Sequence, residues 1–320
     1  MGIIDTLSAG FDTVRRRPWL VLVPVLLNVG LWLAPKLSVS TLVRSGLALL
    51  AAQAVGSPES LGNLHEAMQL MQEMADSLNL SSLLASSYLG VPSLPIGDTT
   101  SFFGWVRPVI EVGSGPGLLG LITALALAGL LIGALYLGLI AQEVRDGRTD
   151  WGRLTRRLLL YWLRLIGAFA LMFGGLIFLA LPVAVVFTIL GLLSEGLASL
   201  LMAIVSFGIV WVLIYLAFVP EAIVLGEDGV VRAIWHSVNV VRVTFWSTLG
   251  IFVLVNMIML GLAFVWRALT VSAAGALLAI AGNAYVGTGL TVALFIYYRD
   301  RFRAWRTAVE ARNLPAGPVG

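Results

Sequence analysis

The sequence predicts an all-α membrane protein: a polytopic bundle of about six transmembrane helices, with three interfacial amphipathic helices and a helical loop on the outer side. Hydrophobic residues make up 59% of the 320 residues and charged residues 12%, whereas soluble domains average about half and about a quarter. Six apolar runs are long enough, or nearly so, to cross about 30 Å of hydrocarbon at about 1.5 Å per residue. Arginines gather at the ends of these runs.

The chain opens with a predicted interfacial helix at residues 1–17. Apolar residues recur on one face at helical spacing, opposite Asp5, Asp12 and Arg15. The first span, residues 18–35, follows a run of three arginines. No clear small-residue cleavage site follows this span, so we expect a retained anchor and not a signal peptide.

The segment 36–116 is too long for a simple connector and is predicted to be an extracytoplasmic helical loop. One apolar helical piece covers residues 39–55, and Ser57, Pro58 and Glu59 have the pattern of a second helix start. Neither helix can bury its apolar face alone. We therefore expect them to pack on each other, on the outer membrane face or on a protein partner.

The rest of the chain alternates spans with polar connections, so that residues 1–320 form a single predicted membrane domain. The remaining elements are a span at 118–141, an interfacial helix at 150–162, spans at 165–193 and 198–219, an interfacial helix at 229–244, spans at 246–266 and 273–298, and a cytoplasmic tail at 299–320. One surface helix followed by two spans thus occurs three times. An internal repeat and three independent amphipathic linkers both explain this order.

The basic residues predict the orientation. With the N-terminus inside, the inner segments hold the arginines at 15–17, 145–164, 232, 242 and 299–312, and the outer segments hold only Lys36, Arg44, Arg107 and Arg267. Basic residues in short loops stay on the cytoplasmic side. We therefore expect a multi-pass protein of a bacterial cytoplasmic (inner) membrane, with both termini in the cytoplasm.

Few side chains in the sequence suggest chemistry. There is no cysteine, and the cores of the six predicted spans contain no Asp, Glu, Lys, Arg or His. Neither a metal site, a cofactor site nor a catalytic set is predicted, and His65 and His236 fall on opposite sides of the membrane under this topology. We interpret His236 as solvated or in contact with headgroups, and Glu221, Glu227 and Asp228 as capping and turn residues.

Two groups of polar residues remain as candidate contact sites. The intramembrane asparagines Asn28, Asn256 and Asn283 either join helices by hydrogen bonds or bind a polar headgroup. The predicted surface helices carry arginines that suit lipid headgroups, namely Arg15, Arg16, Arg153, Arg156, Arg157, Arg232 and Arg242. Because the arginines are spread over helix ends and form no single patch, nucleic acid is not an expected partner.

The segment 218–250 resembles a signature of a bacterial superfamily of six-span membrane proteins, which includes the membrane domain of glycerophosphodiester phosphodiesterases and uncharacterised stand-alone relatives. The matching residues are Pro220, Glu221, the Glu227-Asp228-Gly229 turn, Ala233, Ser237, Arg242 and Trp246. The resemblance implies a helical bundle with interfacial helices and no assigned reaction. The soluble hydrolase domain of those phosphodiesterases has no room in this chain.

Together these observations predict a non-enzymatic integral membrane protein whose partners are membrane lipids, either interacting with them or associated with the envelope. Two alternatives stay open. One is a transporter or permease for a hydrophobic or lipid-like solute, and the other is an accessory subunit of a larger membrane complex, with a protein partner bound through the outer loop 36–116.

Overall fold

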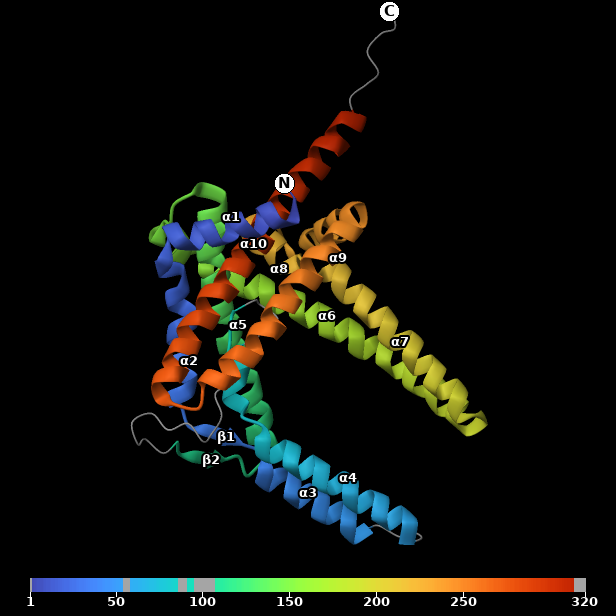
Figure 1. Ribbon diagram of the computed structural model, residues 1–320. Coiled ribbons are helices and arrows are strands. Elements are labelled where there is room, and N and C mark those ends of the chain that lie inside the picture. Colours follow the sequence, from blue (N-terminus) through green and yellow to red (C-terminus); the bar gives the residue numbers. More distant parts are fainter. Residues whose placement is uncertain (1, 54–57, 86–90, 95–106, 314–320) are drawn as a thin grey trace, which may run out of the picture. The chain divides into compact units, whose positions relative to one another are not determined.

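The computed structural model describes residues 2–53, 58–85, 91–94 and 107–313 (Figure 1). The described part is almost entirely helical, which confirms the predicted all-α class. Its α-helices are α1 (Ile3–Arg16), α2 (Leu22–Leu33), α3 (Ser40–Gln53), α4 (Pro58–Ser77), α5 (Gly115–Asp146), α6 (Trp151–Leu193), α7 (Glu195–Leu216), α8 (Val219–Leu225), α9 (Val230–Leu269) and α10 (Ala273–Asn313). Helix α4 begins at Pro58, as the pattern of a helix start at residues 57–59 predicts, whereas the capping residue Ser57 and the tail beyond residue 313 lie outside the described residues.

Within the described residues, five helices are long and apolar enough to cross a membrane: α5, α6, α7 with α8, α9 and α10. A sixth span is obtained if α1 and the segment Pro18–Leu33 are counted together, although these two are bent by 96°. These helices are compatible with a multi-pass membrane protein, as the hydropathy of the sequence predicts.

The sharp bend after α1 has a local cause. Arg17 has φ −132° and ψ 64°, and its N–H donates to the carbonyl oxygens of Thr13 and Val14. Pro18 follows it, and a proline disfavours helical geometry in the preceding residue. The chain therefore leaves α1 at Arg17 and continues in a new direction through the 3₁₀ helix η1 (Pro18–Val21) into α2.

The other two predicted surface helices are continuous with the spans that follow them. The segments 150–162 and 165–193 form the single helix α6, so the predicted boundary between them is absent. The segments 229–244 and 246–266 form α9, whose backbone leaves helical geometry at Thr244, with φ −119° and ψ 28°. Surface helix and span share one periodicity, so periodicity alone does not place a boundary between them.

The chain contacts group into two compact units. Unit 1 comprises residues 1–20, 134–260 and 288–320, and unit 2 comprises residues 21–133 and 261–287. Helices α5, α9 and α10 each contribute residues to both units.

In unit 1, α1 packs closely against α10. A Cβ added at Gly10 would lie 2.5 Å from the carbonyl oxygen of Gly289 and 2.8 Å from the Cβ of Ala293. One at Gly289 would lie 2.6 Å from the ring of Phe11. The absence of side chains at both glycines therefore lets the two helices touch.

Helices α6 and α7 of unit 1 form a hairpin (Figure 1). Most of its large apolar side chains are exposed, among them Phe178, Leu192 and Phe207. Such a surface is what a membrane hairpin presents to lipid.

In unit 2, Trp32 of α2 packs with Ala276 and Ile280 of α10 in a small buried cluster. Helices α3 and α4 form a second hairpin (Figure 1), tied by an ion pair of 3.2 Å between Arg44 and Asp76. The structure also contains two short parallel β-strands that the sequence did not predict, β1 (Lys36–Ser38) and β2 (Val109–Glu111), which pair with each other.

Candidate functional site

The candidate site lies in unit 1 at the turn between α8 and α9. Glu227 in this turn has φ 57°, in the left-handed region that favours glycine. Such a conformation in a residue with a side chain costs about 1–3 kcal/mol and persists where surrounding contacts hold it. In this protein the holding contacts come from arginines of α5 and α6 and from Tyr161 of α6.

Helix α6 supplies four of these contacts from one face. Arg153, Arg157, Tyr161 and Arg164 follow one another at spacings of four, four and three residues, which places them on a common side of the helix. Arg153 lies 2.8 Å and Arg157 3.4 Å from the Glu227 carboxylate, and the Tyr161 hydroxyl donates to it at 3.3 Å. Arg164 donates to the Glu227 backbone carbonyl at 2.6 Å.

Helix α5 completes the arginine cluster, which we define as Arg145, Arg153, Arg157 and Arg164. Arg145 lies 3.0 Å from the Glu227 carboxylate and 3.1 Å from Asp146. Asp146 also lies 3.5 Å from Arg153. Four guanidinium groups thus converge, and among the described residues two carboxylates, those of Glu227 and Asp146, form ion pairs with them.

The surroundings keep Glu227 ionised. Partial burial raises its pKa, but the hydrogen bond from Arg153 and the charges of Arg145 and Arg157 outweigh this and hold the pKa of Glu227 below its usual value. The sequence did not predict this role, because the partners of Glu227 lie 63 to 82 positions away. One signal in the sequence pointed to this contact: the arginines from 153 to 164 recur at helical spacing and need an acidic partner, and the turn at Glu227 and Asp228 offers one.

Asp228, the next residue of the turn, pairs with His236. Its carboxylate lies 2.7 Å from Nδ1 of His236, whose ring also contacts those of Phe302 and Trp305 at centroid distances of 4.9 and 5.8 Å. Only 16% of the His236 side chain is exposed. Of the two interpretations of His236, that of a solvated residue was therefore wrong, because Phe302 and Trp305 of α10 cover its ring, and that of contact with headgroups stays a prediction.

Glu221 is buried in the first turn of α8 and does not cap that helix. Its Oε2 atom finds no hydrogen-bond partner among the described residues, nor does the hydroxyl of Tyr298 on α10. The capping interpretation thus fails for Glu221. Within the described residues, no group of three or more His, Cys, Asp or Glu side chains could hold a metal ion.

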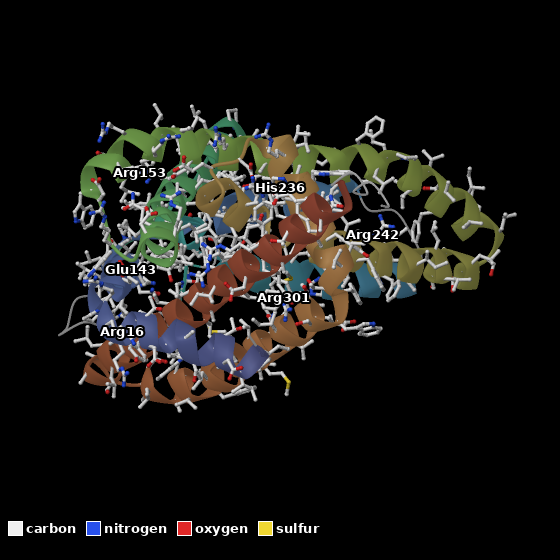
Figure 2. All side chains as sticks on the ribbon, turned by 90° about the horizontal axis from the view of Figure 1, so that it is seen from above. Arg16, Glu143, Arg153, His236, Arg242 and Arg301 are labelled. Atoms are coloured by element: carbon white, nitrogen blue, oxygen red, sulfur yellow. The ribbon has the colours of Figure 1, made fainter. Side chains whose placement is uncertain are left out.

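The other predicted headgroup arginines lie at the surface of unit 1, on α1, α6 and α9 (Figure 2). Arg15 pairs with Asp12 at 3.1 Å, and Arg156 donates to the Gly152 carbonyl at 2.9 Å. Arg16, Arg232 and Arg242 are exposed and make no ion pair within the described part of the chain. The structure therefore separates the seven predicted arginines into two in the cluster and five outside it.

The three asparagines do not share one environment. Asn28 is buried in unit 2, where its amide nitrogen donates to the carbonyls of Pro24 and Pro92 and its oxygen accepts from the Leu94 N–H. Asn283, also in unit 2, is buried, and its amide nitrogen has no partner among the described residues. Asn256 is exposed and donates to the Phe252 carbonyl of its own helix.

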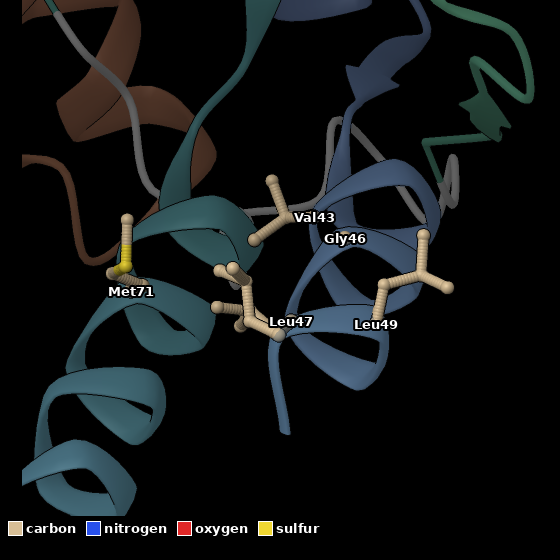
Figure 3. Close-up of a pocket in the computed structure, with 6 residues that line it drawn as sticks. Val43, Gly46, Leu47, Leu49 and Met71 are labelled. Atoms are coloured by element: carbon tan, nitrogen blue, oxygen red, sulfur yellow. The ribbon is translucent and has the colours of Figure 1, made fainter. Parts of the chain in front are cut away.

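The hairpin of α3 and α4 contains an open apolar hollow of about 500 Å³ (Figure 3). Its lining consists of Val43, Gly46, Leu47, Leu49, Leu50 and Met71. None of these side chains can donate or accept a strong hydrogen bond, so the hollow has no chemistry of its own.

Comparisons with protein-family models, with curated proteins and with solved structures found no match. The resemblance of the segment 218–250 to the six-span superfamily stays a prediction.

Proposed function

We propose that this chain is a non-enzymatic, multi-pass protein of a bacterial cytoplasmic membrane that binds anionic lipid headgroups at the cytoplasmic face of unit 1. The observation that carries the proposal is a set of exposed arginines next to exposed tryptophans. Arg156, Arg232 and Arg242 share helices α6 and α9 with Trp151, Trp235 and Trp246, whose side chains are 59%, 63% and 81% exposed.

Physical chemistry links this combination to a membrane surface. Tryptophan favours the headgroup layer, where its ring is half in hydrocarbon and its N–H meets polar groups. An arginine near an anionic surface contributes about 1 kcal/mol of attraction.

The proposal is tested by native mass spectrometry of the protein in a mild detergent, titrated with phosphatidylglycerol or phosphatidylcholine. A triple variant, with Arg16, Arg232 and Arg242 each changed to Gln, should retain fewer phosphatidylglycerol molecules and an unchanged number of phosphatidylcholine molecules. These three arginines make no ion pair within the described residues, so their removal should leave the fold intact.

A matched control comes from the same helix. Arg267, an exposed residue in the last turn of α9, belongs to the predicted outer side. Arg267→Gln should retain as much phosphatidylglycerol as the unchanged protein, whereas Arg242→Gln alone should retain less. Equal retention by the triple variant and the unchanged protein would refute the proposal.

A second candidate function, membership of a larger membrane complex, is favoured by the hairpin of α3 and α4. Leu49, Leu50, Leu70, Met71 and Met74 are exposed on it, and exposed apolar surface of this kind is typical of interaction sites. If a partner covers the hairpin, the Leu50→Gln and Met71→Gln variants should elute from a sizing column in mild detergent at a lower mass than the unchanged protein. Equal masses would argue against it.

The transport alternative finds less support. It calls for a cavity at mid-membrane depth lined by Asn28, Asn256 or Asn283. Asn28 and Asn256 instead bond to backbone groups of their own helix or of the segment 91–94. Asn283 is buried with an amide nitrogen that has no partner among the described residues, and this single polar group does not define a solute path.

A further inference from the structure

We propose that the arginine cluster is a discrete binding site for one phosphate ester, which binds Arg153 and Arg157 on the side that Glu227 leaves open. This inference rests on the proposed function and deepens it, because it assigns one defined site within a surface otherwise described only as basic.

The charge balance of the cluster favours an added anion. Arg145, Arg153, Arg157 and Arg164 carry four positive charges, and the carboxylates that contact them, Glu227 and Asp146, carry two negative ones. Arginine stays protonated in proteins. The surplus therefore stays at two charges at neutral pH, which one phosphate monoester or two diesters would balance.

Donor groups remain on the exposed side of the cluster. Arg157 makes a single ion pair within the described residues, at 3.4 Å, although a guanidinium has five N–H donors. The side chains of Arg153 and Arg157 are 41% and 42% exposed, whereas that of Arg145 is 21% exposed. The unused donors thus belong to the two arginines that an approaching ligand meets first.

Arginine pairs of this kind recognise phosphate by two parallel N–H···O bonds. Arg153 and Arg157 are one helical turn apart on α6, which places their guanidinium groups close enough to share one phosphate group. Arg156, exposed on the same helix, adds positive charge beside them.

Tryptophans at the end of α6 that carries Arg153 and Arg157 indicate that this end lies in the headgroup layer. Trp151, in the first turn of the helix, contacts Trp19 at a ring-centroid distance of 6.1 Å. Interfacial tryptophans lie at the depth of lipid phosphates. A phosphate ester on a lipid would therefore reach Arg153 and Arg157 without leaving its own layer.

Glu227 occupies part of this site as an internal anion. Its carboxylate uses the same guanidinium groups that a phosphate would use, so it competes with the ligand. Removing its charge should strengthen phosphate binding, whereas loss of a purely structural residue would weaken it. The sign of this change separates a ligand site from a structural ion-pair network.

The experiment measures the affinity of detergent-solubilised full-length protein for short-chain phosphatidylglycerol, with short-chain phosphatidylcholine, glycerol 3-phosphate and inorganic phosphate as parallel probes. Arg157→Gln should weaken binding of phosphatidylglycerol about tenfold or more, since hydrogen bonds to charged groups are involved. Glu227→Gln should strengthen it severalfold. Arg303→Gln, at an exposed site on α10 outside the cluster, should leave it unchanged.

The probes and variants separate the outcomes. Equal binding of phosphatidylglycerol and glycerol 3-phosphate would identify the phosphate group alone as the ligand, whereas tighter binding of the lipid would identify a lipid headgroup. Two results would refute the site and leave the proposed function standing, provided that phosphatidylglycerol binds the unchanged protein. The first is an equal affinity of Arg157→Gln and Arg303→Gln for phosphatidylglycerol. The second is weaker binding by Glu227→Gln although its melting temperature stays close to that of Arg157→Gln. If no anionic lipid binds the unchanged protein, both are refuted.

Discussion

Asn28 illustrates how a single buried side chain can hold a distant segment onto a helix. Its three hydrogen bonds, of 2.6, 2.8 and 2.7 Å, reach Pro24, Pro92 and Leu94. Asn28→Ala would leave the Leu94 N–H and the buried Pro92 carbonyl without their partner. We expect the free energy of unfolding to fall by about 2 kcal/mol, measured by SDS-induced unfolding in mixed micelles.

The matched control for this prediction is Asn256→Ala, which removes the same atoms from an exposed helix position. Hydrogen bonds of polar side chains in membrane helices contribute about 0.6 kcal/mol on average, and that of Asn256 stays within its own helix. The free energy of unfolding of this variant should therefore fall by less than about 0.6 kcal/mol. Similar losses for both asparagines would contradict the assignment of a linking role to Asn28.

Glu227 gives a prediction about pH at the same scale. Its pKa is lower in the folded protein than in the unfolded chain, because the arginine contacts outweigh the effect of burial. The ionised carboxylate thus contributes stability at neutral pH, and this contribution is lost progressively as the pH falls below the ordinary glutamate pKa and through the lower pKa of the folded state. The difference between the melting temperatures of the unchanged protein and of Glu227→Gln should be largest at about pH 7 and should shrink steadily as the solution is acidified below that range. A constant gap between them would show that the ion pairs add no stability.

At the scale of elements, the contact between α1 and α10 depends on two small residues. A Cβ at Gly10 would lie within 3 Å of atoms of Gly289 and Ala293, two of them backbone atoms, which cannot move aside cheaply. Gly10→Ala should therefore destabilise unit 1 by about 1–3 kcal/mol, as overpacking does elsewhere. Gly30→Ala is the control, because nothing lies within 4 Å of a Cβ at Gly30. Equal stabilities in detergent would mean that α1 does not rest on α10.

The sequence predicted the elements better than their junctions. The spans were predictable because apolar runs of sufficient length leave few alternatives in lipid, and the proline at position 18 marks the 96° bend that follows α1. The continuity of α6 was not predictable, since amphipathic and apolar segments share the same helical period. Whether the axis turns between them is decided by packing, which a single sequence does not contain.

The candidate site was predictable only in part, for a related reason. Arg153 and Arg157 were identified from their place on an amphipathic face, a local property. Their contact with Glu227 joins residues about 70 positions apart, and Glu227 itself looked like an ordinary turn residue beside Asp228 and Gly229. The left-handed backbone at Glu227 is a tertiary property as well, because the arginines that hold it come from two other helices.

At the scale of the whole molecule, the proposed orientation assigns α1 and the part of α10 after residue 298 to the cytoplasmic side and the segment 36–116 to the outside. The absence of cysteine from the sequence makes this assignment directly testable, because one introduced cysteine is a unique target. Ser8 on α1 and Ser77 on α4 are both exposed and differ from cysteine by one atom. Either substitution should leave the fold unchanged.

In intact cells, a membrane-impermeant maleimide should label Ser77→Cys and spare Ser8→Cys. After the membrane is permeabilised, both should react equally, which controls for the accessibility of each thiol within the protein. The physical basis is the distribution of arginines, since translocating the segment from Arg145 to Arg164 would carry six of them across the membrane. Labelling of Ser8→Cys from outside would show that the topology is the reverse of the proposed one. The arginine cluster would then lie on the outer surface, away from the anionic cytoplasmic leaflet on which the proposed lipid binding depends.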